Sequence, residues 1–231
     1  PPLGTLYAAA YVRQANYTVA LFDSMLAQNP EQLSATLAEE QPRFTILFED
    51  NFNYLTKMCL TRMREAAFIM IDLAAKSGST VIVSGSDATD HVEDYLNHGA
   101  QYILAGEGEA TLVSLLDALT GRTQEPPEKV TGLVYRNNGQ TVRTPPRGFM
   151  KDLDVLPEPA RDLIDMEEYR LAWHRRHGYF SMNMVTTRGC PFKCNWCAKP
   201  IYGNRYNSHS PEYVAQQLLD LKSRYGPDHI W

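Results

Sequence analysis

Short apolar segments alternate with segments of helical periodicity through the first half of the chain, and this alternation constrains the fold more than any other feature. Strands are expected at residues 17–24, 44–50, 80–86 and 102–106, and helices at 3–12, 29–40, 59–77, 90–99 and 108–119. Strands and helices that alternate in this way form βαβ units around a parallel sheet. The pattern therefore predicts an α/β fold built on such a sheet.

The remainder of the chain follows other patterns, so three regions are expected. A Rossmann-like domain should occupy residues 1–125, a hairpin and an irregular linker residues 126–179, and a second αβ pattern residues 180–231. In the last region a strand at 180–187 precedes a cysteine-containing loop, a helix at 210–224 and the start of another strand. The chain begins without Met and ends within this pattern. We therefore expect a fragment, with the first strand of the sheet upstream of Pro1.

Charge and hydropathy exclude some classes of partner. The net charge is −5 over 231 residues, which gives no indication of non-specific nucleic-acid binding. No apolar run approaches the roughly 18 residues that a membrane helix needs, and no signal peptide opens the chain. We expect a cytoplasmic protein that neither binds nucleic acid nor inserts into a membrane.

Three of the four cysteines lie within eight positions, in the spacing C-x3-C-x2-C: Cys190, Cys194 and Cys197. Four cysteines are too few for a disulfide scaffold, so metal binding is the better interpretation. A structural zinc site needs four ligands, and the fourth would be His209, because Cys59 is expected to be buried on a helix. A [4Fe–4S] cluster held by only three thiolates would instead leave one iron open. The spacing leaves both kinds of site open.

Two loops that follow expected strands are the other candidate binding segments. Parallel sheets bind ligands beyond the carboxyl ends of their strands. The loops there are "SGSDAT" (84–89) and "AGEGEA" (105–110), and their candidate binding residues are Ser84, Gly85, Ser86, Gly106, Glu107 and Gly108. The alternative is that the glycines only form turns and that Glu107 and Glu109 favour the N-terminus of the next helix.

The cysteine loop resembles the cluster motif of the radical S-adenosylmethionine (radical SAM) enzymes. The likeness rests on the C-x3-C-x2-C spacing, on the aromatic Trp196 before the last cysteine, and on a position after the first strand of a βα pattern. The segments "RGCPFKCNWC", "GEGEATLVSLLDAL" and "DLDVLPEPARDLID" resemble the branch of that family with an N-terminal cobalamin-binding domain. The resemblance covers the whole chain.

This resemblance implies three cofactors and assigns residues to them. Cys190, Cys194 and Cys197 would hold a [4Fe–4S] cluster, and Trp196 would lie on the S-adenosylmethionine side. Residues 84–86 and 106–108 would contact cobalamin, while residues 1–4 and 48–56 would line the same crevice. Residues 180–231 would be the first part of a truncated radical SAM (β/α) barrel.

The implied function is that of an enzyme. It would cleave S-adenosylmethionine reductively and use cobalamin as second cofactor to methylate an unactivated carbon or phosphorus centre of a small molecule. Its electron donor would be a ferredoxin or a flavodoxin, and the fragment alone should be inactive. The alternatives are a cobalamin-dependent radical cyclase or rearrangement enzyme, and a non-catalytic module that binds zinc or cobalamin.

Overall fold

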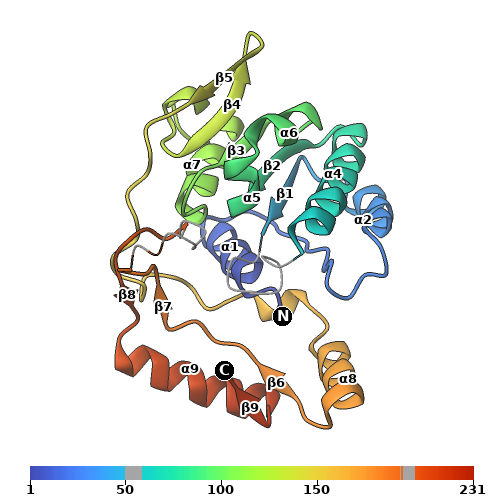
Figure 1. The fold of residues 1–231 in the computed structure, drawn as a ribbon, viewed down its shortest axis with the longest axis vertical. Coiled ribbons are helices and arrows are strands. Elements are labelled where there is room, and N and C mark those ends of the chain that lie inside the picture. The colour runs from blue at the N-terminus through green and yellow to red at the C-terminus, as the bar shows by residue number, and fades with distance from the viewer. Residues whose placement is uncertain (50–58, 193, 195–200) are drawn as a thin grey trace.

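A five-stranded sheet organises the first two thirds of the chain in the computed structural model, which describes residues 1–49, 59–192, 194 and 201–231 (Figure 1). Its strands are β1 (Phe44–Phe48), β2 (Thr80–Ser84), β3 (Tyr102–Leu104), β4 (Leu133–Asn137) and β5 (Gln140–Arg143), in that spatial order. The first three pair in parallel, and β4 and β5 add an antiparallel hairpin. The α/β fold with a largely parallel sheet is confirmed.

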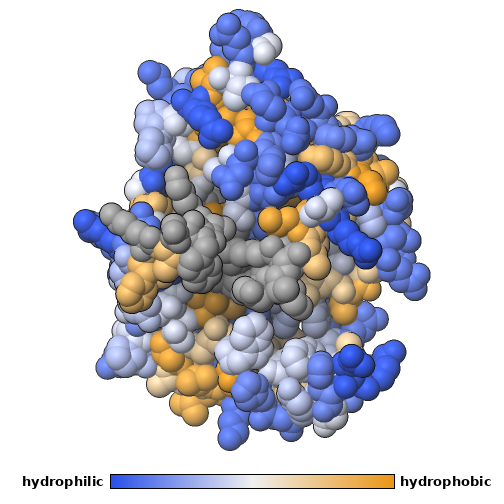
Figure 2. Space-filling view, in the orientation of Figure 1, coloured by the Kyte–Doolittle hydropathy of each residue, from blue (hydrophilic) through white to orange (hydrophobic). Residues whose placement is uncertain are grey.

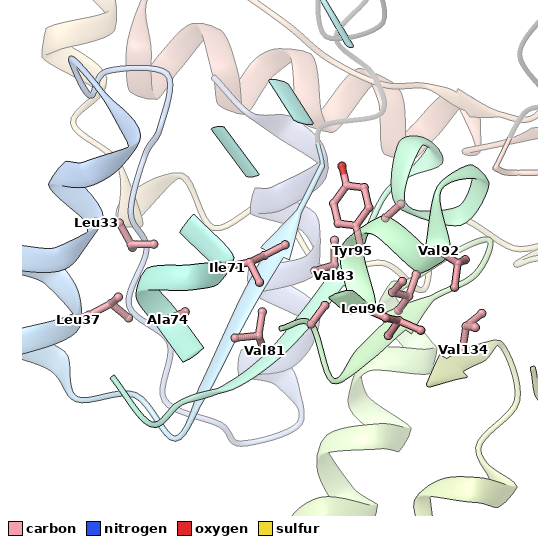
Figure 3. Packing of buried hydrophobic residues seen from close by; sticks show 13 residues of the cluster. Leu33, Leu37, Ile71, Ala74, Val81, Val83, Val92, Tyr95, Leu96 and Val134 are labelled. Atoms are coloured by element: carbon pink, nitrogen blue, oxygen red, sulfur yellow. The ribbon is translucent and has the colours of Figure 1, made fainter. Parts of the chain in front are cut away.

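Helices cover both faces of this sheet. They are α1 (Leu3–Gln14), η1 (Pro30–Gln32), α2 (Leu33–Glu40), α4 (Leu60–Lys76), α5 (Ser86–Asp90), α6 (Val92–Asn97), α7 (Glu109–Thr120) and η2 (Pro127–Lys129). On β2, Val81 and Val83 face α2, α4 and α6 (Figure 3), while Ile82 faces α1 and α7. Successive residues of a strand point to opposite faces, so this short apolar strand supplies both cores.

A smaller group of elements follows the hairpin. It comprises η3 (Arg161–Leu163), α8 (Met166–His177), β6 (Ser181–Met182), β7 (Thr187–Arg188), β8 (Asn207–Ser208), α9 (Pro211–Tyr225) and β9 (His229–Ile230). β6 pairs in parallel with β9 across α9, which confirms the expected βα unit. Ser210 caps α9 by accepting a hydrogen bond from the backbone N–H of Tyr213, and Gly226 ends the helix in the left-handed conformation.

Several expected elements differ in the structure. Residues 17–24 form no strand. Instead, the Tyr17 hydroxyl attaches this segment to α7 by donating a hydrogen bond to Asp117 (2.7 Å). The strand expected at 180–187 is divided, because β6 pairs with β9 whereas β7 pairs with β8. The sheet also continues past residue 125, since β4 pairs with β3.

The linker contains a helix that the sequence analysis did not predict. α8 begins where the Asp165 carboxylate accepts the backbone N–H groups of Glu167 and Glu168, and it ends at Gly178. Its cap residues are ordinary helix signals, but its apolar stripe is narrow: Met166, Tyr169 and Trp173 pack beside Phe180 and Leu221, and most of its other residues are charged or polar. No helix among the described residues combines the length and apolar character needed to cross a bilayer.

The position of Ile82 between the sheet and α1/α7 leads to a stability prediction. Ile82 is 0% exposed, so Ile82→Ala should lower the free energy of unfolding by about 2–5 kcal/mol through lost burial and a residual cavity. Urea unfolding followed by circular dichroism measures this change. Leu219→Ala is the control, because Leu219 is 64% exposed and its loss should change stability by less than about 0.5 kcal/mol. Equal effects of the two substitutions would contradict this core assignment.

Candidate functional site

The loop after β3 and the strand before the cysteines meet in a buried ion pair. Arg188, on β7, donates from Nη1 to Glu107 Oε1 (2.6 Å) and from Nη2 to Glu109 Oε1 (2.7 Å). Arg188 is 2% exposed, and the two glutamates are 8% and 1% exposed. Two carboxylates, one in the loop after β3 and one on the first residue of α7, therefore hold a single guanidinium that lies about 80 positions later in the chain.

Aromatic rings complete the surroundings of this guanidinium. Its carbon lies 5.7 Å from the ring centre of Tyr7 on α1 and 4.8 Å from that of Tyr202, which follows the cysteine loop. Burial opposes the charge of Arg188, but the Glu109 and Glu107 carboxylates outweigh it and keep the pKa of the guanidinium above its ordinary value. Arg188 therefore stays charged at every working pH.

Glu107 also joins the linker to this site. Its second oxygen, Oε2, accepts the backbone N–H of Met150 at 2.6 Å. Burial raises the pKa of the Glu107 carboxyl, and the Met150 N–H and Arg188 oppose that rise. The sequence analysis assigned Glu107 to cobalamin. That assignment stays a prediction, and in the structure both oxygens of this carboxylate are bound to the protein itself.

The cysteine loop begins directly after Arg188. Gly189 has φ +82°, and a Cβ at this position would overlap the carbonyl oxygen of Arg205. The next residue, Cys190, donates its backbone N–H to the carbonyl of Gly203 at 3.2 Å. Only glycine fits between Arg188 and Cys190, because the two ends of the loop come together at that point.

The predicted cluster ligands lie partly within the described residues. Cys190 is half-buried, Cys194 is exposed, and neither is in a disulfide. Cys197 and Trp196 lie outside the described residues. Two free thiols four positions apart fit the donor set of an iron–sulfur cluster, which thiolates hold. Within the described ranges no three His, Cys, Asp or Glu side chains gather around a possible metal position.

The residues considered for a fourth zinc ligand have other surroundings. Cys59 is exposed at the start of α4. The expectation that it is buried was wrong, because the residue precedes the first helical turn and lies off the packed face. His209 is buried, with Nδ1 2.9 Å from Asp154 Oδ1 and its ring stacked on Tyr213.

The two loops predicted to bind cobalamin lie side by side at the carboxyl edge of the parallel strands. A Cβ on Gly108 would overlap Ser84 Oγ and the ring of Phe48, so these residues are in direct contact. Ser84 is 1% exposed, which places its hydroxyl beneath the loop surface. The structure thus brings residues 84–86 and 106–108 together, and their contacts with a cofactor stay a prediction.

A glutamate that the sequence analysis did not single out lies in front of the loop after β2. Glu49 Oε2 accepts the backbone N–H of Ser86 at 2.8 Å, and a Cβ on Gly85 would overlap the same carboxylate. Burial raises the pKa of Glu49, while the backbone N–H groups of Ser86 and Asp87 oppose the rise. A ligand that approaches Gly85 closely must therefore displace this carboxylate.

The next residue of that loop is held firmly in place. The Asp87 carboxylate accepts two hydrogen bonds from Arg64 (2.7 and 2.6 Å) and one from the Tyr95 hydroxyl (2.9 Å). Burial disfavours the Asp87 anion, but the hydrogen bonds from Arg64 and Tyr95 outweigh it and lower its pKa. The loop therefore has one fixed side, at Asp87, and one side covered by Glu49. On the face of the molecule drawn in Figure 2, the coloured surface is largely hydrophilic, with apolar side chains in separate patches.

Comparison with known proteins finds relatives in sequence but no matching family model. No protein-family model matches the chain. It is 36% identical over 130 residues to the uncharacterized methyltransferase PH0819 of Pyrococcus horikoshii (55% of this chain, 27% of the relative). It is 29% identical over 148 residues to the anaerobic magnesium-protoporphyrin IX monomethyl ester cyclase of Synechocystis (63% of this chain, 28% of the relative). The bacteriochlorophyllide d C-8(2)-methyltransferase of Chlorobaculum tepidum is 22% identical over 201 residues (85% and 39%).

Solved structures share the fold over nearly the whole chain. The cobalamin-dependent S-adenosylmethionine radical enzyme OxsB, with aqua-cobalamin and S-adenosylmethionine bound, has a TM-score of 0.72 at 20% identity (99% of this chain, 30% of that chain). The radical S-adenosylmethionine methyltransferase TsrM from Kitasatospora setae has a TM-score of 0.70 at 18% identity (96% and 44%). The expected resemblance to cobalamin-dependent radical SAM enzymes is confirmed at the level of the fold. The chain spans 27% of the length of PH0819 and 39% of that of the Chlorobaculum relative.

The buried carboxylate in front of Gly85 predicts a pH dependence of stability. Because burial raises the pKa of Glu49 above its ordinary value of 4.5, the folded chain holds this proton more tightly than the unfolded chain. Its contribution to stability is complete below pH 4.5 and is lost as the pH rises through the raised pKa. Glu49→Gln should remove this pH-dependent part of the free energy of unfolding. Between pH 4.5 and the raised pKa, its slope is at most about 1.4 kcal/mol per pH unit.

Urea unfolding of both proteins between pH 4 and 8 measures the difference. The exposed Glu40→Gln is the matched control, since it makes the same change of net charge at the surface. A stability difference between Glu49→Gln and the parent chain that does not vary with pH would contradict the assignment.

Proposed function

We propose that this chain is part of a radical SAM enzyme that holds a [4Fe–4S] cluster, S-adenosylmethionine and cobalamin, and that the enzyme is a methyltransferase. The observation that carries the proposal is the position of the C-x3-C-x2-C loop. It follows β7, and Arg188 at its start is bonded to the loop after β3, at the edge where parallel sheets bind ligands. The cysteine loop thus begins next to the loop after β3, which follows a parallel strand and is one of the two loops proposed to contact cobalamin.

The comparisons support this assignment through proteins of the same fold. Solved neighbours are described with aqua-cobalamin, S-adenosylmethionine or a [4Fe–4S] cluster bound, and two of the relatives in sequence are named methyltransferases. When bound, such cofactors supply an electron for the reductive cleavage of S-adenosylmethionine and a methyl group for transfer. The substrate would be a small molecule with an unactivated carbon or phosphorus centre, and the electron donor a ferredoxin or a flavodoxin.

The part played by this chain's own residues is to bind and to orient. Cys190, Cys194 and Cys197 would hold the cluster, with Trp196 on the S-adenosylmethionine side. Ser86, Gly85 and the loop at 106–108 would receive cobalamin once Glu49 moves aside. Arg188 holds the cysteine loop on the sheet domain.

A second candidate reaction is radical cyclisation. The 29% identity over 148 residues to an anaerobic cyclase favours it as the alternative within the same class. The products formed from a shared substrate, methylated or ring-closed, separate the two reactions by mass.

The cluster is tested by anaerobic reconstitution with iron and sulfide. The parent chain should develop a broad absorbance near ~400 nm that dithionite bleaches. Cys194→Ser should lose most of it, because a ligand is removed, whereas Cys59→Ser should keep it, because Cys59 precedes α4 and lies outside the motif. A colourless protein that retains one zinc ion per chain would overturn the proposal in favour of a zinc module.

Cobalamin binding is tested by incubation with hydroxocobalamin followed by desalting and absorbance spectroscopy. The parent chain should retain corrin absorbance. Ser86→Ala should weaken binding about fivefold, the loss of one hydrogen bond worth about 1 kcal/mol. Ser114→Ala is the control, since that hydroxyl bonds the carbonyl of Ala110 within α7. Equal retention by Ser86→Ala and the parent would remove Ser86 from the site, and no retention by the parent would contradict the cobalamin assignment.

A further inference from the structure

The ion pair of Arg188 with Glu107 and Glu109, here called the clamp, connects distant parts of the chain. Glu107 and Glu109 lie 81 and 79 positions before Arg188. The clamp is nearly inaccessible to water, since its three members are between 1% and 8% exposed. It is the contact through which the start of the cysteine loop is bonded to the sheet domain.

Its composition indicates a role beyond stability. Replacing a buried ion pair by apolar side chains is often neutral or stabilising, so such a pair is weak evidence for a contribution to folding energy. What a guanidinium that bridges two carboxylates does supply is fixed geometry, because its planar N–H groups can donate to both in only a few orientations. The clamp also holds two carboxylates against one guanidinium, so with both carboxylates ionised it carries a net charge of −1.

One end of the clamp contacts the cysteine loop. Cys190 is two residues after Arg188, a separation of at most about 7 Å between Cα atoms. Tyr202, whose ring lies against the guanidinium, precedes Gly203, whose carbonyl accepts the Cys190 N–H. Arg188 therefore touches both ends of the loop that carries the cysteines.

The other end controls the loop after β3. Glu107 and Glu109 flank Gly108, which is in contact with Ser84 and Phe48 at the ends of β2 and β1. Glu107 in addition fixes Met150 of the linker. A movement of Arg188 would therefore be transmitted to the edge of the sheet on one side and to the cysteine loop on the other.

We propose that Arg188 is a positioning residue: its clamp fixes the cysteine loop against the loop after β3, and the net negative charge of the clamp makes the cluster harder to reduce. The charge effect rests on the proposed function, whereas the positioning effect does not. Removal of the clamp would separate the cysteines from the crevice of the sheet domain. Removal of one carboxylate charge would raise the reduction potential of the cluster.

Positioning is tested on the metal-free chain by the rate at which each cysteine is alkylated by a maleimide, resolved by mass spectrometry. Arg188→Met should increase the alkylation rate of Cys190 by about tenfold, because local opening then exposes a half-buried thiol. Arg188→Lys should restore part of the protection. Cys59 is the internal reference, and Arg136→Met, which breaks the exposed pair with Glu93, is the matched control; both should keep the parent rates.

Circular dichroism shows whether Arg188→Met folds. If it does not, Glu109→Gln is the variant to use, since an amide oxygen can still accept a hydrogen bond from Arg188 while one charge is lost. This variant should increase the alkylation rate of Cys190 to a smaller extent. Unchanged protection of Cys190 in a folded Arg188→Met, or in Glu109→Gln where Arg188→Met is unfolded, would overturn the positioning role.

The charge effect is tested on the reconstituted chain by anaerobic redox titration. Glu109→Gln should shift the reduction potential to a more positive value, and Glu93→Gln, which removes an exposed carboxylate of the hairpin pair, should not. A potential unchanged by Glu109→Gln would overturn the charge effect. A parent chain that takes up no cluster would refute the proposed function and the charge effect together, while the alkylation rates would still decide the positioning role.

Discussion

The burial of Arg188 between Glu107 and Glu109 is the interaction on which the arrangement of this molecule depends. A guanidinium with 2% exposure is costly unless charged partners compensate it, and its ion pairs with Glu107 and Glu109 join β7 to the loop after β3 and to the start of α7. That requirement brings the cysteine loop to the carboxyl edge of the parallel strands. It also brings Tyr7 and Tyr202, which lie at opposite ends of the chain, to the same guanidinium. The position of the cysteine loop on the sheet domain thus depends on the ion pairs of Arg188.

The loop after β2 shows the same principle on a smaller scale. Asp87 is held by Arg64 and Tyr95, so the first turn of α5 has a fixed position. Glu49 lies on the other side of the loop, where it accepts the N–H of Ser86 and covers Gly85. The edge of the sheet therefore combines a rigid support with a carboxylate that a ligand has to displace.

Much of the fold could be predicted from local patterns. The strands 44–50, 80–86 and 102–106 and the helices 59–77, 108–119 and 210–224 are present with small changes at their ends, because short apolar runs and helical periodicity report burial directly. Ser210, Pro211 and Gly226 marked the limits of α9 through ordinary capping chemistry. The prediction of strands failed where strand formation depends on a pairing partner elsewhere in the chain. Residues 17–24 are apolar enough for a strand but pair with no strand in the part of the chain that the structure describes, and the strand at 180–187 is divided between two partners.

The candidate site divides in the same way. The sequence alone determined which residues are the candidates for metal binding, because the C-x3-C-x2-C spacing is local. It also placed residues 84–86 and 106–108 after parallel strands, where the structure finds them side by side. Only the tertiary structure decided how the buried charges are paired. In the sequence, "GEGE" favours the start of a helix, and Arg188 is only an arginine two positions before a cysteine. Their partnership across 81 positions follows from burial, since an ion excluded from water must take the countercharge that the packed chain brings to it, and no local pattern specifies which one that is.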